Sequence, residues 1–421
     1  WQQFLHADTA QVRNSGQCVH SYVRSTPDLL SGRTSYWMAA LLTQRCKSMT
    51  SNKGFSLKDQ MFNIEKVRYF GGLFHVADPE FDTDGFVAEV METMLDLELK
   101  ARMNLVSEVL ENYLPSDFVL AAKHIHAALP LPLDPAKNDD DFGWLILGSL
   151  GEFVARNGLD DLNISLPLLR EITKRSSMEF ALRHFLIAAQ DETMAELERW
   201  LQDDHYHVRR LVSEGTRPTL PWGLKTGLMA TDPLPFLDAL HADKTRFVTR
   251  SVANHLNDIS KKNPQLVVDT LIRWQKLGKQ NPSELDWMAR HALRTLVKKG
   301  DKAALALLGF HDQPDIKVSF LTFTRNIKIG EIGEINFDIV AIGNENLMID
   351  YVIDFVKSNG TTSPRVFKLK KLSMKAGQTV HLKKKHRFLK DASTFTHFAG
   401  MHRLMLQING QNFGTCDFTL N

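Results

Sequence analysis

The hydrophobic period of the chain changes once, near residue 310, and this change constrains the fold more than any other feature of the sequence. From residue 56 to about residue 310, apolar residues recur at i, i+3, i+4 and i+7, in segments separated by short breaks that contain Pro or Asp. After a polar break at residues 311–315, apolar and polar residues alternate instead. The sequence therefore predicts a mainly α chain in which a helical part precedes an all-β part.

A weak repeat runs through the later helices of the first part. The segments FALRHF, HVRRLV, FVTRSV and WMARHA each have Arg at the fourth position, at Arg183, Arg210, Arg250 and Arg290. The separations of 27, 40 and 40 residues are close to paired-helix HEAT-like units in the last two cases. Such units stack into an α-solenoid arc, and a row of arginines on its inner helices would follow a phosphate backbone. The alternative is that each Arg pairs with an acidic residue of the next repeat.

Other polar side chains follow these arginines by one or two helical turns, or lie at helix ends, where a cation also complements the helix dipole. Together with the arginine row, they form the predicted DNA-binding set of the helical part. Its further members are Arg217, Asn254, Lys261, Arg294 and Lys298.

The β part has seven or so short strands rich in β-branched and aromatic residues, separated by Gly, Asn and Pro turns. This pattern predicts an immunoglobulin-like β-sandwich over residues 315–421, without an inter-sheet disulfide because Cys416 has no partner there. Between Arg365 and Lys390 there are ten Lys and Arg residues and no acidic residue. We expect this basic patch, with Lys383, Lys384 and Lys385 at its centre, to bind an anion, although a solubilising surface is the alternative.

Residues 1–54 differ from the rest, with Arg in excess over acidic residues and no sustained period. They resemble a transit-type peptide in composition. The simpler interpretation is a leader that is disordered or foreign to the native protein. We therefore predict three parts: the leader, a helical-repeat domain at residues 55–312, and the sandwich at residues 315–421.

Cysteine usage and hydropathy limit the compartment. The chain has only three cysteines and no CxxC spacing, which favours a reducing environment. No apolar run approaches the roughly 20 residues needed to span a bilayer. These features predict a soluble, cytoplasmic protein that does not bind a membrane, and the formal net charge of +2 argues for no particular partner.

The densest chemistry lies in residues 198–222, ERWLQDDHYHVRRLVSEGTRPTLPW. A helix should end near Trp200, and Asp203 and Asp204 follow as turn or N-cap residues of a second helix, with Asp204 the expected cap. Gly215 should end that second helix. The two prolines of the following TRPTLPW segment exclude a helix, so a stiff loop that carries Trp222 is predicted.

Four segments carry a resemblance to a known family: SMEFALRHF, HVRRLVSEGTRPTLPW, the upstream DPEFD, and FGWLILGSLGEFVARNGL. Over residues 56–310 the chain resembles the bacterial AlkC-type DNA alkylation repair proteins, which belong with AlkD to the HEAT-like-repeat alkylpurine DNA glycosylases. Some members also have a carboxy-terminal immunoglobulin-like domain. The resemblance implies excision of cationic methylated purines, 3-methyladenine foremost, from duplex DNA. It also implies a monomer associated with the bacterial nucleoid.

The residues can account for this chemistry without a cofactor or a metal, for which the sequence has no motif. An alkylated purine is already cationic, so the enzyme needs a carboxylate near the developing oxocarbenium ion rather than an acid for the leaving group. The candidates are Glu179, Asp203, Asp204 and Glu152, in that order of preference, and each also has a structural role open to it. The Trp and Asp four residues apart in AlkD-type enzymes have no convincing counterpart here, so the role is not transferred from them.

Aromatic rings would favour a cationic base through cation–π attraction, and Trp144 and Trp222 are the aromatic residues expected near the lesion. The competing hypothesis is a non-catalytic helical-repeat module that binds DNA or a protein. Both hypotheses explain the arginine row. Only the glycosylase hypothesis explains acidic residues beside it, because these weaken the binding of a polyanion.

Overall fold

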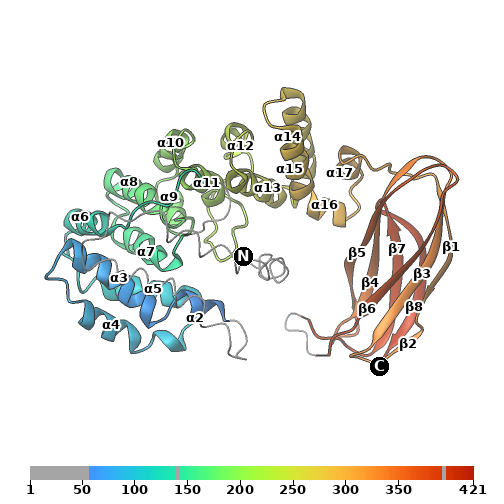
Figure 1. The fold of residues 1–421 in the computed structure, drawn as a ribbon, viewed down its shortest axis with the longest axis horizontal. Helices are drawn as coiled ribbons and strands as arrows, with labels where there is room; N and C mark the ends of the chain where they lie inside the picture. The colour runs from blue at the N-terminus through green and yellow to red at the C-terminus, as the bar shows by residue number, and fades with distance from the viewer. Residues whose placement is uncertain (1–55, 138–142, 391–394) are drawn as a thin grey trace, which may run out of the picture. The chain divides into compact units, whose positions relative to one another are not determined.

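The computed structural model describes residues 56–137, 143–390 and 395–421 of the chain. Within these ranges, helices are followed by strands, with the change after Leu307, as Figure 1 shows. The predicted fold class is confirmed: a helical-repeat arc is followed by an immunoglobulin-like β-sandwich. The predicted leader lies outside the described residues.

The first half of the arc consists of helices of 3 to 14 residues, several of which begin at a side-chain cap that accepts a backbone N–H. These elements are α2 (Leu57–Met61), α3 (Ile64–Ala77), α4 (Thr83–Met91), η3 (Met94–Asp96), α5 (Leu99–Leu110), α6 (Phe118–Ala128), η4 (Leu145–Leu147) and α7 (Gly148–Asn157).

The second half contains the segment richest in charged side chains. Its elements are α8 (Leu162–Thr173), α9 (Ala181–Ala188), α10 (Gln190–Trp200), α11 (Tyr206–Gly215), α12 (Leu234–Leu240), α13 (Arg246–Ser260), α14 (Pro264–Leu277), α15 (Pro282–Ala292), α16 (Arg294–Lys298) and α17 (Lys302–Leu307). Helices α10 and α11 end at Trp200 and Gly215, as predicted. No helix in the described part of the chain is long and apolar enough to cross a membrane.

Helices α9, α11, α13 and α15 are successive members of one row, and they carry the four repeat arginines. Contacts join α7 to α9, α11 to α13 and α13 to α15, while α10, α12 and α14 each contact the two row helices that flank them in the sequence. Leu182 of α9 contacts α11 so closely that a Cβ on Gly215 would lie 2.4 Å from its Cδ2. The four repeat arginines thus lie on successive helices of one row.

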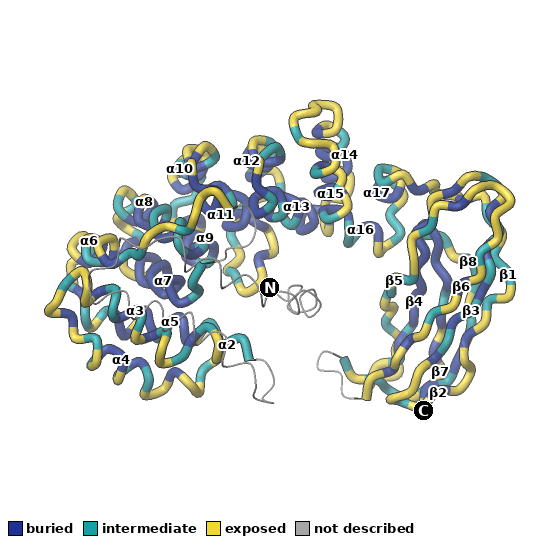
Figure 2. Tube along the Cα trace, viewed as in Figure 1, coloured by how far each residue is buried: buried dark blue, intermediate teal, exposed yellow. Residues whose placement is uncertain are grey.

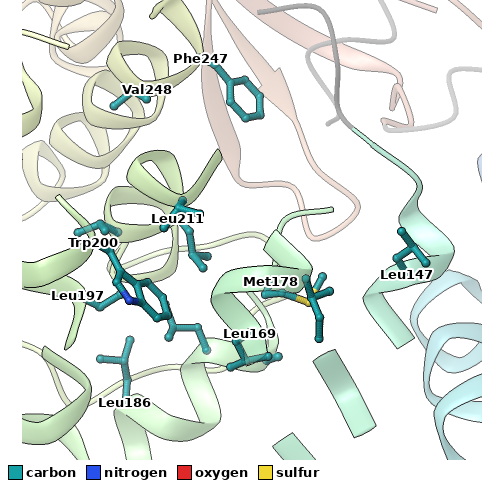
Figure 3. Close-up of a cluster of buried hydrophobic side chains, with 14 of the residues drawn as sticks. Leu147, Leu169, Met178, Leu186, Leu197, Trp200, Leu211, Phe247 and Val248 are labelled. Carbon is teal, nitrogen blue, oxygen red and sulfur yellow. The ribbon is translucent and has the colours of Figure 1, made fainter. Parts of the chain in front are cut away.

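One apolar cluster runs through the arc and fixes the row. Figure 3 shows Leu186, Leu197 and Trp200 packed together, with Leu211 of α11 nearby, and all four side chains are almost fully buried. Helices α11 and α13 are buried along most of their length, as Figure 2 shows. Polar side chains on these two helices are therefore held in fixed positions rather than free in solvent.

The β part is a two-sheet sandwich around a second apolar cluster. Its strands are β1 (Ile316–Phe323), β2 (Asn326–Ile327), β3 (Ile332–Ala341), β4 (Glu345–Val356), β5 (Thr362–Met374), β6 (Thr379–Arg387), β7 (Gly400–Ile408) and β8 (Gln411–Leu420). One sheet has the order β1-β3-β6 and the other the order β2-β8-β7-β4-β5, with only the β2–β8 pair parallel. Ile335, Phe337 and Ile339 of β3 alternate inward, as the period of two requires.

The basic patch lies on strands at the margins of the two sheets. Strand β5 is the last strand of the five-stranded sheet and β6 the last of the three-stranded sheet. Charged residues on an outer strand discourage pairing with another sheet and leave the cations accessible. The linker is fixed to the sandwich by His311, whose backbone oxygen accepts a hydrogen bond from Asn409 and whose ring lies 3.0 Å from Glu345.

Candidate active site

Glu179 lies just before α9 and is the most buried of the four candidate residues. The residue is only 6% exposed. Within the described ranges, its buried Oε2 atom accepts no hydrogen bond, and the ion-pair contact of that atom is with Arg210 Nη1 at 3.5 Å. A buried carboxylate oxygen without a donor is energetically costly, so its retention calls for an explanation beyond stability.

Arg210 of α11 connects this carboxylate to a second one. Its Nη2 atom lies 3.6 Å from Glu214 Oε1, and its Nη1 donates to Ser177 Oγ at 2.9 Å. The guanidinium also lies over the ring of Phe247, 4.6 Å from the centroid. Arg210 is therefore fixed by two acids, a hydroxyl and an aromatic face, and its charge partly balances Glu179.

Glu214 belongs to a buried network that extends from α11 to α13. Arg217 Nη1 donates to Glu214 Oε1 at 2.6 Å, and its Nη2 lies 2.8 Å from Asp258 Oδ2. Ser251 Oγ donates to Glu214 Oε2 at 2.6 Å. Burial alone would raise the pKa of Glu214, but Arg210, Arg217 and the Ser251 hydrogen bond outweigh it and lower the pKa to about 2. Glu214 thus stays ionised and holds both arginines.

The paired aspartates before α11 have structural environments. Asp203 Oδ2 accepts from Arg170 Nε at 2.5 Å, and its Oδ1 accepts from the backbone N–H of His205 at 2.8 Å. Asp204 is exposed and is not the cap, because His205 caps α11 through its ring nitrogen. The expectation that Asp204 caps the helix is therefore wrong. Asp203 has its carboxylate occupied, which leaves Glu179 the better candidate of the two.

Glu152 lies in α7, and Trp144 is the N-cap residue of η4. Glu152 is half-buried and has no ion pair among the described residues. Arg156, four residues later on the same helix, binds Glu108 of α5 and Glu111, the C-cap residue of α5. The ring of Trp144 stacks on Tyr69 at 4.6 Å between centroids and has the ammonium group of Lys66 3.7 Å from its own centroid. Its faces are thus already in contact with protein groups.

Trp222 is the more accessible of the two predicted aromatic residues. It lies in the loop after α11, is 49% exposed, and has φ of 62°. The Nζ atom of Lys100, on α5, lies 3.5 Å from the Trp222 carbonyl oxygen and 4.7 Å from the ring centroid of Phe180, the residue after Glu179. Lys100 therefore connects the Trp222 loop to the segment that carries Glu179.

The prediction that Arg183 binds DNA is wrong. It is only 1% exposed, and its guanidinium donates to the backbone oxygens of Gly215, Arg217 and Leu224. A phosphate cannot reach a guanidinium so enclosed. Arg217 is likewise buried, between Glu214 and Asp258, so its predicted contact with DNA is also replaced by a structural role.

Three other predicted DNA-binding residues of the arc lie on α13 and α15. Asn254 of α13 accepts hydrogen bonds from His291 and from Arg294 Nη2 at 2.9 Å, which ties α13 to the following helices. Arg290 is exposed and pairs with Asp286 on its own helix. Arg250 is half-buried, and burial lowers its pKa.

The lysines that end the helices are exposed. Lys261 forms an ion pair with Asp258 at 2.9 Å, and Lys298 lies at the end of α16. In the sandwich, Lys383 pairs with Glu334 at 2.7 Å, Lys384 is half-buried and Lys385 is exposed. The described residues include no group of three or more His, Cys, Asp or Glu side chains suited to hold a metal ion.

Sequence reasoning missed Lys100, Ser177 and Ser251. Lys100 lies on α5 and contacts the Trp222 loop and Phe180, and Ser251 lies on α13 and contacts Glu214 of α11. Nothing in the sequence next to either residue points to these contacts. Glu214 is not among the four predicted carboxylates, and the structure shows it in contact with both Arg210 and Arg217. The i, i+3 and i, i+4 spacings from Glu214 were the available signal.

The fold and this charged row define a helical-repeat protein with an appended immunoglobulin-like domain. Residues 317–421 match the family described as "Uncharacterised protein YhaZ, C-terminal Ig-like domain". The chain is 35% identical over 345 residues to "Uncharacterized protein YhaZ" of Bacillus subtilis (strain 168). This match covers 81% of this chain and 92% of that protein.

A solved structure extends this relationship. The structure of "Pseudomonas fluorescens alkylpurine DNA glycosylase AlkC bound to DNA containing an abasic site analog" is 34% identical to this chain and superimposes with a TM-score of 0.77. The match covers 87% of this chain and all of that one. The chain belongs to the AlkC family of HEAT-like-repeat proteins.

Proposed function

We propose that the protein is a DNA glycosylase that hydrolyses the N-glycosidic bond of cationic alkylated purines in duplex DNA, with 3-methyladenine the foremost substrate. The observation that carries the proposal is the Glu179 carboxylate, buried and short of one hydrogen-bond donor, next to Arg210 on the arginine row. The family relationship supports the same conclusion, because the AlkC structure is that of an alkylpurine DNA glycosylase on DNA.

The proposed reaction needs little from the protein beyond electrostatics and positioning. The electrons of the C1′–N9 bond pass to the base and neutralise its positive charge, while C1′ acquires oxocarbenium character. The Glu179 carboxylate stabilises this charge and aligns a water molecule, whose oxygen bonds to C1′. The proton released by the water passes to the carboxylate and then to solvent.

Arg210 has two roles in this proposal. It holds the Glu179 carboxylate in place through their contact at 3.5 Å, and its position on the row with Arg250 would bring a DNA phosphate near the carboxylate. The half-exposed ring of Trp222 offers a surface for the cationic base or for the sugar left after its release. The exposed lysines of the sandwich, such as Lys385, would add a second positively charged surface for duplex DNA.

Release of free base from methylated duplex DNA tests the proposal. The wild-type protein, acting as a monomer, should release 3-methyladenine that chromatography detects, whereas Glu179→Gln should release it at least a hundredfold more slowly. Equal binding of methylated and undamaged duplex without release of any base would contradict the proposal and favour a non-catalytic DNA-binding module.

A further inference from the structure

The loop between α11 and α12 holds a tryptophan in a backbone conformation that its side chain disfavours. Residues 220–223 form a β-turn, closed by donation from Gly223 N–H to the carbonyl oxygen of Leu220 at 3.1 Å. Pro221 fixes a negative φ at the second position, and Trp222 has φ of 62° at the third, a combination found in type II turns. That third position usually needs Gly, because a Cβ is strained at positive φ.

Contacts from outside the turn hold this conformation, and Arg183 makes most of them. Its Nη1 atom donates to the carbonyl oxygen of Gly215 at 2.7 Å and of Arg217 at 3.0 Å, on the chain before the turn. Its Nε atom donates to the carbonyl oxygen of Leu224, on the chain after the turn. One guanidinium therefore clamps both ends of the segment that presents Trp222.

The side chain of Arg183 also packs directly beneath the turn. A Cβ on Gly223 would lie 3.1 Å from Arg183 Cδ, so the turn rests on the aliphatic part of the arginine. Arg183 forms no ion pair with a carboxylate among the described residues, and its Nε and Nη1 atoms bind backbone oxygens. Such a guanidinium orders a loop rather than balancing a charge. From the other side, Lys100 Nζ lies 3.5 Å from the Trp222 carbonyl oxygen.

We propose that Arg183 is a positioning residue, which holds the strained turn so that the exposed ring of Trp222 meets the alkylated nucleotide beside Glu179. This inference rests on the proposed glycosylase function and adds to it, because the arginine acts through the tryptophan and never touches DNA. It also explains why a tryptophan occupies a position that favours glycine. Strained residues of this kind persist where the surrounding structure determines them and function requires them.

The experiment compares Arg183→Met with Arg209→Met in the full chain. Arg209 is the control because it is also buried on the arc and binds the backbone oxygens of Asp203 and Asp204, away from the Trp222 loop. It also forms an ion pair with the buried side chain of Asp243, so its loss should disturb the fold at least as much as the loss of Arg183. At equal DNA saturation, Arg183→Met should release 3-methyladenine at least tenfold more slowly than Arg209→Met, since a misplacement of about 1 Å can cost roughly a hundredfold.

Two further readouts separate positioning from other roles. Affinity for undamaged duplex should keep its wild-type salt dependence in Arg183→Met, whereas loss of a phosphate contact would lower the slope by about one. In a Trp222→Ala background, Arg183→Met should cause no additional loss of excision rate, because the residue through which it acts is already gone.

Equal excision by Arg183→Met and Arg209→Met, or full additivity with Trp222→Ala, would overturn the positioning role while the glycosylase proposal stood. If Arg183→Met does not fold, hydrogen exchange of the Gly223 amide in the wild-type protein decides instead. The clamp predicts strong protection, and exchange at the rate of an unstructured peptide would refute it. If the wild type released no base at all, the proposed function itself would fail, and the role of Arg183 in the reaction with it.

Discussion

Replacing Glu214 with Gln should destabilise the arc by an amount that the structure allows us to work out. The pKa of Glu214 is about 2 in the folded protein, about 2.5 below its ordinary value of 4.5. At about 1.4 kcal/mol per unit, the ionised carboxylate contributes about 3 kcal/mol to the free energy of unfolding at pH 7. Because the residue is fully buried, solvent screening does not reduce this figure.

The same linkage fixes the pH dependence. The folded-state pKa lies below the unfolded-state value, so the contribution is fully present above about pH 4.5 and is lost as the pH falls toward about 2. Glu214→Gln should therefore unfold at lower urea concentration at pH 7 and should lack this part of the acid dependence. Breaking a buried ion pair by removing one partner costs about 3–5 kcal/mol in other proteins, which agrees with the estimate.

Urea unfolding followed by far-ultraviolet circular dichroism is the suitable assay, because the helices of the arc supply most of that signal. Glu108→Gln is the control: Glu108 pairs with Arg156 on the surface, where an ion pair contributes about 0–1 kcal/mol. A Glu214→Gln protein with wild-type stability at pH 7, or with the wild-type slope between about pH 4.5 and 2, would refute the reasoning.

Two further predictions concern DNA binding. Arg250→Ala should weaken binding to any duplex and reduce the slope of log affinity against log salt by about one; an unchanged slope in a salt titration would exclude a phosphate contact. Deletion of residues 315–421 should weaken DNA binding and excision but leave the arc folded, because the arc has its own apolar cluster and repeats are stabilised mainly by their neighbours. The circular dichroism spectrum of the shortened protein should show that its helices remain folded. If its DNA binding and excision are then unchanged, the sandwich has another task.

The fold could be predicted because it depends on periodicity, which the sequence contains. The switch from a period near 3.6 to a period of two marked the end of the arc and the start of the sandwich. The ends of α10 and α11 followed from local turn chemistry, at Trp200 and Gly215. The repeat spacing also placed the four arginines on separate helices, which the structure shows as α9, α11, α13 and α15.

The roles of individual side chains could not be predicted in this way, because they depend on what another segment places against them. Arg183 and Arg210 have the same position in the repeat, yet the Trp222 loop covers Arg183 and leaves Arg210 beside Glu179. Asp203 and Asp204 are neighbours of the same type, and Asp203 is distinguished by Arg170, which approaches from α8, as well as by the backbone N–H of His205. Such long-range contacts leave no local signal in a single sequence.

The rate of 3-methyladenine release under single-turnover conditions, measured for wild type, Glu179→Gln and Asp203→Asn, tests the central claim most directly. We predict that Glu179→Gln binds methylated duplex at least as tightly as wild type, because a negative charge facing a polyanion is removed, yet releases the base at least a hundredfold more slowly. Asp203→Asn should instead lose thermal stability, because its carboxylate binds Arg170. Wild-type excision by Glu179→Gln would contradict the assignment of Glu179 as the catalytic carboxylate.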